Sequence, residues 1–89
     1  MSDSPLLTVI VACRNPGERL RAALASVWAQ QPAPPELVVA DGASTDGTRD
    51  WLEQNRARIS TLIAEPDHGV YDAMNKGVAA ARGDWVLFL

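Results

Sequence analysis

The stretch from Glu36 to Thr48 constrains the fold of this chain more than any other. It opens with an apolar, β-branched run of the kind that fills a strand covered on both faces, and such strands belong to parallel sheets flanked by helices. It closes with Asp, Gly, Ser and Thr residues, which turn a chain and expose polar groups. Asp41 stands where this strand is expected to end, just after Ala40. A carboxylate in that place, followed by small residues, is typical of nucleotide or phosphate sites in α/β sheets.

Apolar runs and amphipathic segments alternate along the whole chain. Strands are predicted at residues 6–13, 36–40, 59–64 and 84–89, and helices at about 15–30, 45–58 and 70–82. The short connections predict an α/β fold in which a mostly parallel sheet of about four strands carries three helices on its faces. Ligands bind beyond the carboxyl ends of the strands in such sheets, and the stretches rich in chemically useful residues all follow strands.

The ends of the predicted helices carry recognisable signals. Asn15 is the expected N-cap of the first helix, and Glu18 completes a capping box with it. Prolines at positions 32, 34 and 35 stop this helix. Ser44 or Thr45 is expected to cap the second helix. The third helix is expected to end at the Arg and Gly of positions 82 and 83.

The apolar sides of the three helices differ in width. The first helix has a continuous stripe, made of Leu20, Ala23, Leu24, Val27 and Trp28. The second helix has a thin apolar side, anchored by Trp51 and Leu52. The apolar side predicted for the third helix consists of Val70, Tyr71, Met74, Val78 and Ala81.

Composition limits the class of protein. A chain of 89 residues makes one small domain, and its net charge of -3, with scattered Lys and Arg, argues against a nucleic-acid partner. The single cysteine, Cys13, cannot form an internal disulfide, and the start of the chain has no signal-peptide pattern, so a cytoplasmic location is expected. No apolar run approaches the roughly 20 residues needed to span a bilayer.

Several known motifs do not fit. Residues 42–47 have the two-glycine spacing of a P-loop, but Thr48 and Arg49 stand where Lys and then Ser or Thr are required. No Gly-x-Gly-x-x-Gly follows the first strand, and the Asp41 segment has too few oxygen ligands for a calcium loop. Residues 13–15 lack the carboxylates of an acidic receiver domain.

Each candidate residue also has an ordinary explanation. Asp41 can belong to a simple Asp-Gly turn, and a lone His68 is more often a surface loop residue than a catalyst. Cys13 is most simply a small buried apolar residue, because no base lies beside it in the sequence. Lys76 and Arg82 are by default solvated charges.

Four stretches together resemble family 2 glycosyltransferases: Val9 to Asn15, Glu36 to Thr48, Glu65 to Gly77, and Ala81 to Leu89. They have the order and spacing of that family and cover nearly the whole chain. The third stretch resembles the branch that builds bacterial surface polysaccharides. The resemblance implies a Rossmann-like GT-A fold, with residues 1–89 as its single nucleotide-sugar-binding part. It also implies an inverting transfer of sugar, often from a UDP-sugar, to a cell-surface polysaccharide or lipid-linked acceptor.

The resemblance implies particular roles in the donor site. Ala12 would contact the nucleotide through its backbone, and Asp41 would accept a hydrogen bond from the uracil ring N–H. Arg14 stands where many relatives carry Tyr against the base, and a planar guanidinium can also stack on a ring. Asp67 lies in the loop that lines the donor pocket, and Ser44 belongs to the same site.

The diphosphate of such a donor requires positive charge. Met74 stands where many relatives carry Arg for this purpose, so Lys76 or Arg14 is expected to supply it. In relatives, an Asp-x-Asp motif that binds Mg²⁺ or Mn²⁺ follows the position of Leu89, and the catalytic base lies farther on. The chain is therefore expected to be a truncated donor-binding half, which binds no metal and has little transferase activity alone. The whole enzyme would act in the cytoplasm or at the inner face of the membrane.

The end of the chain and the overall function each carry a further expectation. A fourth strand beside the first, ending at Leu89, would leave an open sheet edge and apolar surface, which predicts self-association. The alternative to an enzyme is a non-catalytic α/β binding or assembly module that keeps the fold. A third possibility is a different nucleotide-dependent enzyme, with affinity for NAD or ATP.

Overall fold

The computed structural model describes residues 7–29, 35–83 and 85–89. In chain order, its elements are β1 (Leu7–Cys13), α1 (Glu18–Trp28), β2 (Glu36–Asp41), α2 (Thr48–Gln54), the 3-10 turn η1 (Arg56–Arg58), β3 (Thr61–Ala64), α3 (Val70–Ala80) and β4 (Trp85–Phe88). The four strands form one parallel sheet in the order β3-β2-β1-β4. The predicted α/β class and the position of the fourth strand beside the first are confirmed.

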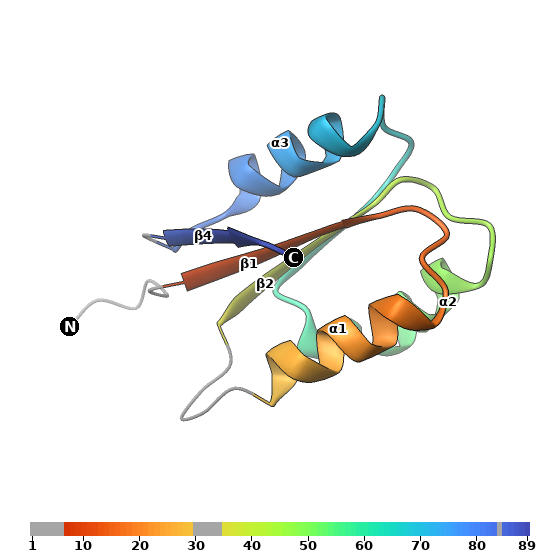
Figure 1. Ribbon diagram of the computed structural model, residues 1–89, viewed down its shortest axis with the longest axis horizontal. Coiled ribbons are helices and arrows are strands. Elements are labelled where there is room, and N and C mark those ends of the chain that lie inside the picture. Colours follow the sequence, from red (N-terminus) through yellow and green to blue (C-terminus); the bar gives the residue numbers. More distant parts are fainter. Residues whose placement is uncertain (1–6, 30–34, 84) are drawn as a thin grey trace.

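The path of the chain places the helices on both faces of the sheet. The chain runs outward from β1 through β2 to β3 and then returns to the other side of β1. Because crossovers between parallel strands are right-handed, the outward path puts α1 and α2 on one face and the return puts α3 on the opposite face (Figure 1). The strand order reverses at β1, and a reversal of this kind opens a crevice at the carboxyl ends of the strands.

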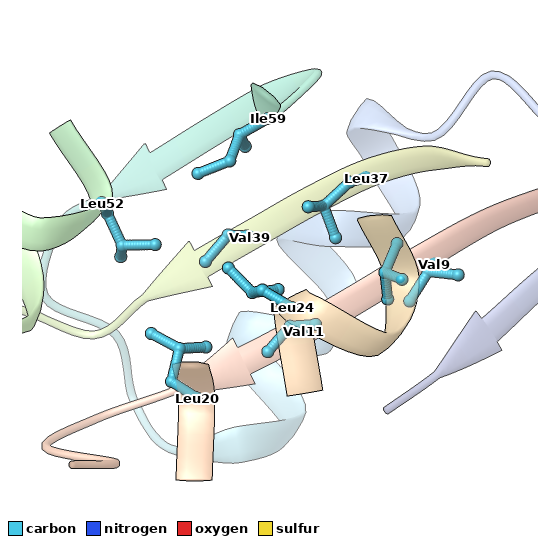
Figure 2. Packing of buried hydrophobic residues seen from close by; sticks show 9 residues of the cluster. Val9, Val11, Leu20, Leu24, Leu37, Val39, Leu52 and Ile59 are labelled. Atoms are coloured by element: carbon cyan, nitrogen blue, oxygen red, sulfur yellow. The ribbon is translucent and has the colours of Figure 1, made fainter. Parts of the chain in front are cut away.

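The main hydrophobic core lies between the sheet and the helices α1 and α2. Figure 2 shows how the buried stripe of α1 meets the side chains of β1 and β2, with Leu52 and Ile59 closing the cluster. Leu52 is fully buried and Trp51 packs against the cluster from its margin, as the sequence predicted for the anchors of α2. This face of the sheet therefore supplies most of the burial that holds the domain together.

The opposite face is covered by α3, which contacts the sheet through small residues. Ala73 is buried, and a Cβ atom at Gly77 would collide with the side chain of Ile10. The apolar side predicted for this helix is wrong, because Tyr71 and Val78 are 80% and 46% exposed. Close approach of the helix to the strands requires small residues at the contact, so the larger apolar side chains are rotated away from the sheet.

The helix ends also differ from prediction. The helix α1 begins at Glu18 behind Gly17 and has no side-chain cap, so the capping box is wrong. The helix α2 begins at Thr48 behind Gly47, which has a left-handed φ of 92°, and neither Ser44 nor Thr45 caps it. It ends at Gln54, and the remainder of the predicted helix is η1.

The strand ends shift by one or two residues. The strand β2 extends through Asp41, whereas β3 begins at Thr61, because Ile59 still ends the 3-10 turn η1 and its N–H donates to the carbonyl of Arg56. The prolines at 32 and 34 and the start of the predicted fourth strand at residue 84 lie outside the described residues.

Candidate functional site

Three loops meet beyond the carboxyl ends of β1, β2 and β3 (Figure 1). Two backbone hydrogen bonds continue the pairing of the strands into these loops. The N–H of Gly42 donates to the carbonyl of Cys13 at 2.8 Å, and the N–H of Glu65 donates to the carbonyl of Asp41 at 3.0 Å. The stretches that the sequence predicted to converge are therefore held together at one end of the sheet.

A cavity of about 210 Å³ opens at the carboxyl end of β1, beside the start of α3. Its walls are formed by Ala12, Cys13, Arg14, Asp67, Gly69, Val70 and Ala73. Three predicted site residues, Ala12, Arg14 and Asp67, thus line one cavity. Small-molecule pockets usually begin at roughly 300 Å³, so these walls are sufficient for part of a ligand rather than for a large ligand such as a nucleotide sugar.

Asp41 lies behind the cavity wall and is only 1% exposed. Its Oδ1 accepts hydrogen bonds from the Ser44 hydroxyl and from the Cys13 thiol, with a distance of 3.6 Å to the sulfur. Its Oδ2 accepts one from the backbone N–H of Ser44 at 3.2 Å. A carboxylate has about four acceptor positions, so the described side chains and amides leave one of them open.

The thiol of Cys13 is protonated at neutral pH. Burial, followed by the negative charge of Asp41 and the hydrogen bond to it, raises the pKa of Cys13 to about 12. Cys13 therefore acts as a hydrogen-bond donor to Asp41 on the cavity wall and not as a nucleophile. The prediction of a simple apolar residue is incomplete, because the side chain is only partly buried and is hydrogen-bonded.

Asn15 joins the loop after β1 to the loop after β2. Its backbone N–H donates to the Ser44 hydroxyl oxygen, and its side-chain Oδ1 accepts from the N–H of Thr45, both at 2.7 Å. The N–H of Gly17 adds a third link, to Asp46 Oδ2 at 3.1 Å. The sequence suggested a helix cap for Asn15. Its φ of 49° suits a residue type that tolerates left-handed backbone.

Asp46, which precedes the N-cap residue Gly47, bonds the first residue of α2, where the sequence suggested Ser44 or Thr45 as a cap. It accepts hydrogen bonds from the hydroxyl and the N–H of Thr48, the latter at 3.0 Å. These bonds, the hydroxyl first, and the bond from Gly17 lower the pKa of Asp46 and together outweigh desolvation, which acts in the opposite direction. The carboxylate thus fixes the turn into α2 while it holds the neighbouring loop.

Asp67 connects the loop after β3 to the loop after β2. Its Oδ1 accepts from the N–H of Gly69 at 3.0 Å. A Cβ atom at Gly42 would lie 2.6 Å from Asp67 Oδ2, so only glycine allows this approach of the two loops. Sequence reasoning treated Gly42 as part of a turn and did not identify this contact.

Lys76 lies behind the loop and does not line the cavity. Its Nζ is 3.1 Å from Glu65 Oε1 and 3.5 Å from Asp72 Oδ2, and it donates to the carbonyl of Pro66 at 3.0 Å. The default expectation of a solvated charge is therefore wrong for Lys76. It is also incomplete for Arg82, which pairs with Glu36 at the other end of the sheet. His68 is exposed in the loop, as expected.

The described residues show neither a metal cluster nor a membrane helix. No group of three or more His, Cys, Asp or Glu side chains among them is arranged to hold a metal ion. None of the described helices is both long and apolar enough to cross a bilayer.

Residues 8–89 match the family described as Glycosyl transferase family 2. The chain belongs to this family. A glycosyltransferase of PGL/p-HBAD biosynthesis from Mycobacterium bovis (strain BCG / Pasteur 1173P2) is 39% identical over 97% of the chain. TuaG of Bacillus subtilis (strain 168), a protein whose name refers to teichuronic acid biosynthesis, is 35% identical over 96% of the chain. The chain spans 35% of the length of each of these two relatives.

A solved structure has the same fold over most of this chain. The crystal structure of S. aureus TarS in complex with UDP-GlcNAc superposes with a TM-score of 0.77 at 28% identity. The match covers 93% of this chain and 25% of the TarS chain. The four-stranded parallel sheet and its three helices thus correspond to part of a larger glycosyltransferase fold of the GT-A type.

Proposed function

We propose that this chain is the nucleotide-sugar-binding part of an inverting glycosyltransferase. The donor would be a UDP-sugar, and the acceptor a cell-surface polysaccharide or a lipid-linked molecule. The observation that carries the proposal is the cavity at the end of β1, where Ala12, Arg14 and Asp67 meet beside the buried Asp41. The family match and the UDP-GlcNAc in the TarS crystal structure support this reading.

The residues around the cavity suit a uridine nucleotide. The backbone of Ala12 would contact the base. The open acceptor position of Asp41, a carboxylate that Ser44 holds in place, would take the uracil ring N–H once the wall that buries it gives way to the ligand. Arg14 is exposed and makes no ion pair with any described residue, so its guanidinium is available to the base or the diphosphate. The positive end of the α3 dipole, at Gly69, faces the same cavity.

The remaining parts of the reaction would belong to residues outside the described ones. A Mg²⁺ or Mn²⁺ ion would neutralise the diphosphate when bound, but the described carboxylates do not form a cluster that fits such an ion. We assign residues 1–89 to donor binding only, and the acceptor site and the catalytic base to the rest of a longer enzyme. A lipid-linked acceptor would place that enzyme at the inner face of the membrane, in the cytoplasm.

Calorimetric titration with UDP, GDP, dTDP, NAD and ATP tests the proposal. We expect saturable binding of UDP, weakened roughly tenfold by Asp41→Asn, because the variant replaces one acceptor oxygen of the carboxylate with an NH2 donor and leaves too few acceptors for the uracil N–H. The substitution keeps the shape of a buried side chain, so the fold is expected to remain intact. Glu53→Gln is the matched control, since Glu53 is exposed and pairs with Arg56 on α2 and η1, away from the cavity.

The other outcomes identify the competing classes. If no nucleotide binds, the result favours a non-catalytic binding or assembly module on the same fold. If NAD or ATP binds in preference to UDP, the chain belongs to a different kind of nucleotide-dependent enzyme. If Asp41→Asn and the parent chain bind UDP with equal affinity, Asp41 does not contribute to UDP binding.

A further inference from the structure

We propose that Lys76 is a positioning residue: together with Asp72, it holds the loop of residues 65–69 so that Asp67 stays on the cavity wall. The inference rests on the proposed function, because the position of Asp67 matters for activity only if a nucleotide binds in that cavity. It resolves the choice between Lys76 and Arg14 as the cation for the diphosphate in favour of Arg14.

The ammonium group of Lys76 is already fully engaged. It has three N–H donors, and three oxygen acceptors surround it: Glu65 Oε1, Asp72 Oδ2 and the carbonyl of Pro66. The side chain is only 27% exposed. A phosphate group could be bound by Lys76 only if one of these contacts were given up.

Lys76 and Asp72 act on the two residues that flank Asp67. Lys76 binds the carbonyl of Pro66, on one side of Asp67. Asp72 accepts a hydrogen bond from the N–H of His68, on the other side, at 2.9 Å. The ion pair between Lys76 and Asp72, one turn apart on α3, connects these two contacts. We call the pair of Lys76 and Asp72, with their bonds to Pro66 and His68, the clamp.

Apart from these contacts, the loop is fixed mainly at its first residue, where the N–H of Glu65 donates to the carbonyl of Asp41. Its residues Glu65, Pro66, His68 and Gly69 are exposed, so apolar packing contributes little to its position. Asp67 itself rests against Gly42 and accepts from Gly69, and both contacts require the loop to stay close to α3 and to the end of β2. Release of the clamp would therefore move the Asp67 carboxylate relative to Arg14 and the cavity.

The charges of the clamp persist at neutral pH. The hydrogen bond to Glu65 and the charges of Asp72 and Glu65 raise the pKa of Lys76, against a smaller effect of desolvation. The hydrogen bond from His68 comes first among the causes that lower the pKa of Asp72, followed by the charge of Lys76, against some desolvation. Both partners remain ionised around pH 7, where the site would operate.

Affinities for UDP and for uridine, measured side by side by calorimetry, distinguish positioning from direct contact. A residue that binds the diphosphate contributes to the affinity for UDP and not to that for uridine. We expect Lys76→Met to weaken both by the same factor, roughly tenfold, as for the loss of one charged hydrogen bond. Lys76→Arg should restore most of both affinities, because it keeps a cation within reach of the same oxygens. Arg56→Met, which removes an exposed and paired cation far from the cavity, is the matched control.

A loss of UDP affinity alone in Lys76→Met, with unchanged uridine affinity, would overturn the proposal. A second measurement does not depend on nucleotide binding: hydrogen exchange of the His68 amide should become at least roughly tenfold faster in Lys76→Met and in Asp72→Asn. Unchanged exchange in both variants would also overturn the clamp. If the parent chain binds neither UDP nor uridine, the proposed function fails, and the exchange rates still decide whether the clamp exists. Lys76 is the only lysine of the chain, so isotope-labelled lysine reports on its ammonium group without overlap.

Discussion

Asn15 illustrates how a residue in a loop can serve a distant loop instead of the nearest helix. Local sequence favours it as the cap of α1, but its backbone and side chain both bind residues of the β2–α2 loop. Through the hydroxyl of Ser44, which bonds Asn15 and Asp41 at once, this link reaches the buried carboxylate. Asn15 is therefore a support of the candidate site that no local pattern could reveal.

Two replacements of Asn15 distinguish the contribution of its side-chain hydrogen bond to stability from that of its left-handed backbone conformation. We expect Asn15→Gly to lower the free energy of unfolding by about 1 kcal/mol, because the bond to Thr45 is lost while the left-handed φ stays accessible. Asn15→Ala should cost about 1–2 kcal/mol more, because alanine is strained at that φ. Urea unfolding followed by tryptophan fluorescence measures both. Equal stability of the two variants would contradict the role of the backbone conformation.

At the scale of elements, the way α3 packs on the sheet determines which face of this helix is buried. Hydrophobic periodicity predicted the helix itself correctly but selected the wrong face. Tyr71 and Val78 have large, mostly apolar side chains and yet are exposed. The helix packs on the sheet at the small residues Ala73, which is buried, and Gly77, which lies against Ile10. Which residues fit at the contact depends on the shapes of both elements, so the hydrophobicity of one segment cannot predict it.

Gly77→Ala tests the packing of α3 against β1 directly. The added methyl group would meet Ile10 in a well-packed contact, so we expect the free energy of unfolding to fall by about 1–3 kcal/mol. Val78→Ala on the exposed side of the same helix is the control and should change it by no more than about 0.5 kcal/mol. A Gly77→Ala variant as stable as the parent in urea would show that α3 can move away from the sheet at no cost.

A buried carboxylate fastens the link between α3 and β4 at the amino end of the sheet. Glu36 Oε1 accepts from the Thr8 hydroxyl at 2.6 Å and from the N–H of Arg82 at 2.7 Å, and Oε2 lies 3.4 Å from Arg82 Nε. Burial tends to raise the pKa of Glu36, but these hydrogen bonds and the charge of Arg82 outweigh it and lower the pKa. This link holds β4 beside β1, at the end opposite to the cavity.

The lowered pKa of Glu36 makes stability depend on pH. Its contribution is complete above the unfolded-state pKa of about 4.3 and is lost as the pH falls through the lower folded-state pKa. We expect urea midpoints to decrease between about pH 5 and pH 3, and Glu36→Gln to flatten part of that decrease. The exposed Glu53→Gln serves as the control. An identical pH profile for Glu36→Gln and the parent chain would contradict this assignment.

At the scale of the whole molecule, β4 is the edge strand of the described sheet and carries exposed apolar side chains. Trp85 and Leu87 are 69% and 50% exposed, and Val70 and Tyr71 of α3 add further exposed surface. Apolar edges of this kind pair readily with other chains. The notion that residues 1–89 belong to a larger fold agrees with their 35% share of the curated relatives.

We expect the 89-residue chain to self-associate through β4. The weight-average sedimentation coefficient should rise with protein concentration, and Leu87→Lys should reduce that rise, because a charge on an edge strand opposes pairing. Val78→Lys on α3 is a comparison variant with the same added charge and a similar exposure of 46% in the parent. Sedimentation as a monomer over a wide concentration range would count against the proposal.

The sequence predicted the architecture well and the candidate site in part. Continuous apolar strands and short connections determined the parallel sheet, and the same topology brought the loops that carry Asp41 and Asp67 to one edge. The partners of Asn15 and Lys76 could not be predicted, because they lie in other loops or depend on how a loop folds back onto its helix. The spacing of residue types within one segment predicts secondary structure, whereas these contacts depend on the tertiary packing of the whole domain.

The central proposal is that a uridine nucleotide binds at the carboxyl end of β1, with part of it in the cavity there. Two-dimensional NMR of the isotope-labelled chain, titrated with UDP, tests it residue by residue. We expect saturable shifts of the backbone amides of Ala12, Arg14 and Gly69, while those of Thr8 and Arg82 at the opposite end of the sheet stay in place. No saturable shift, or shifts confined to the Thr8 and Arg82 end, would contradict the account.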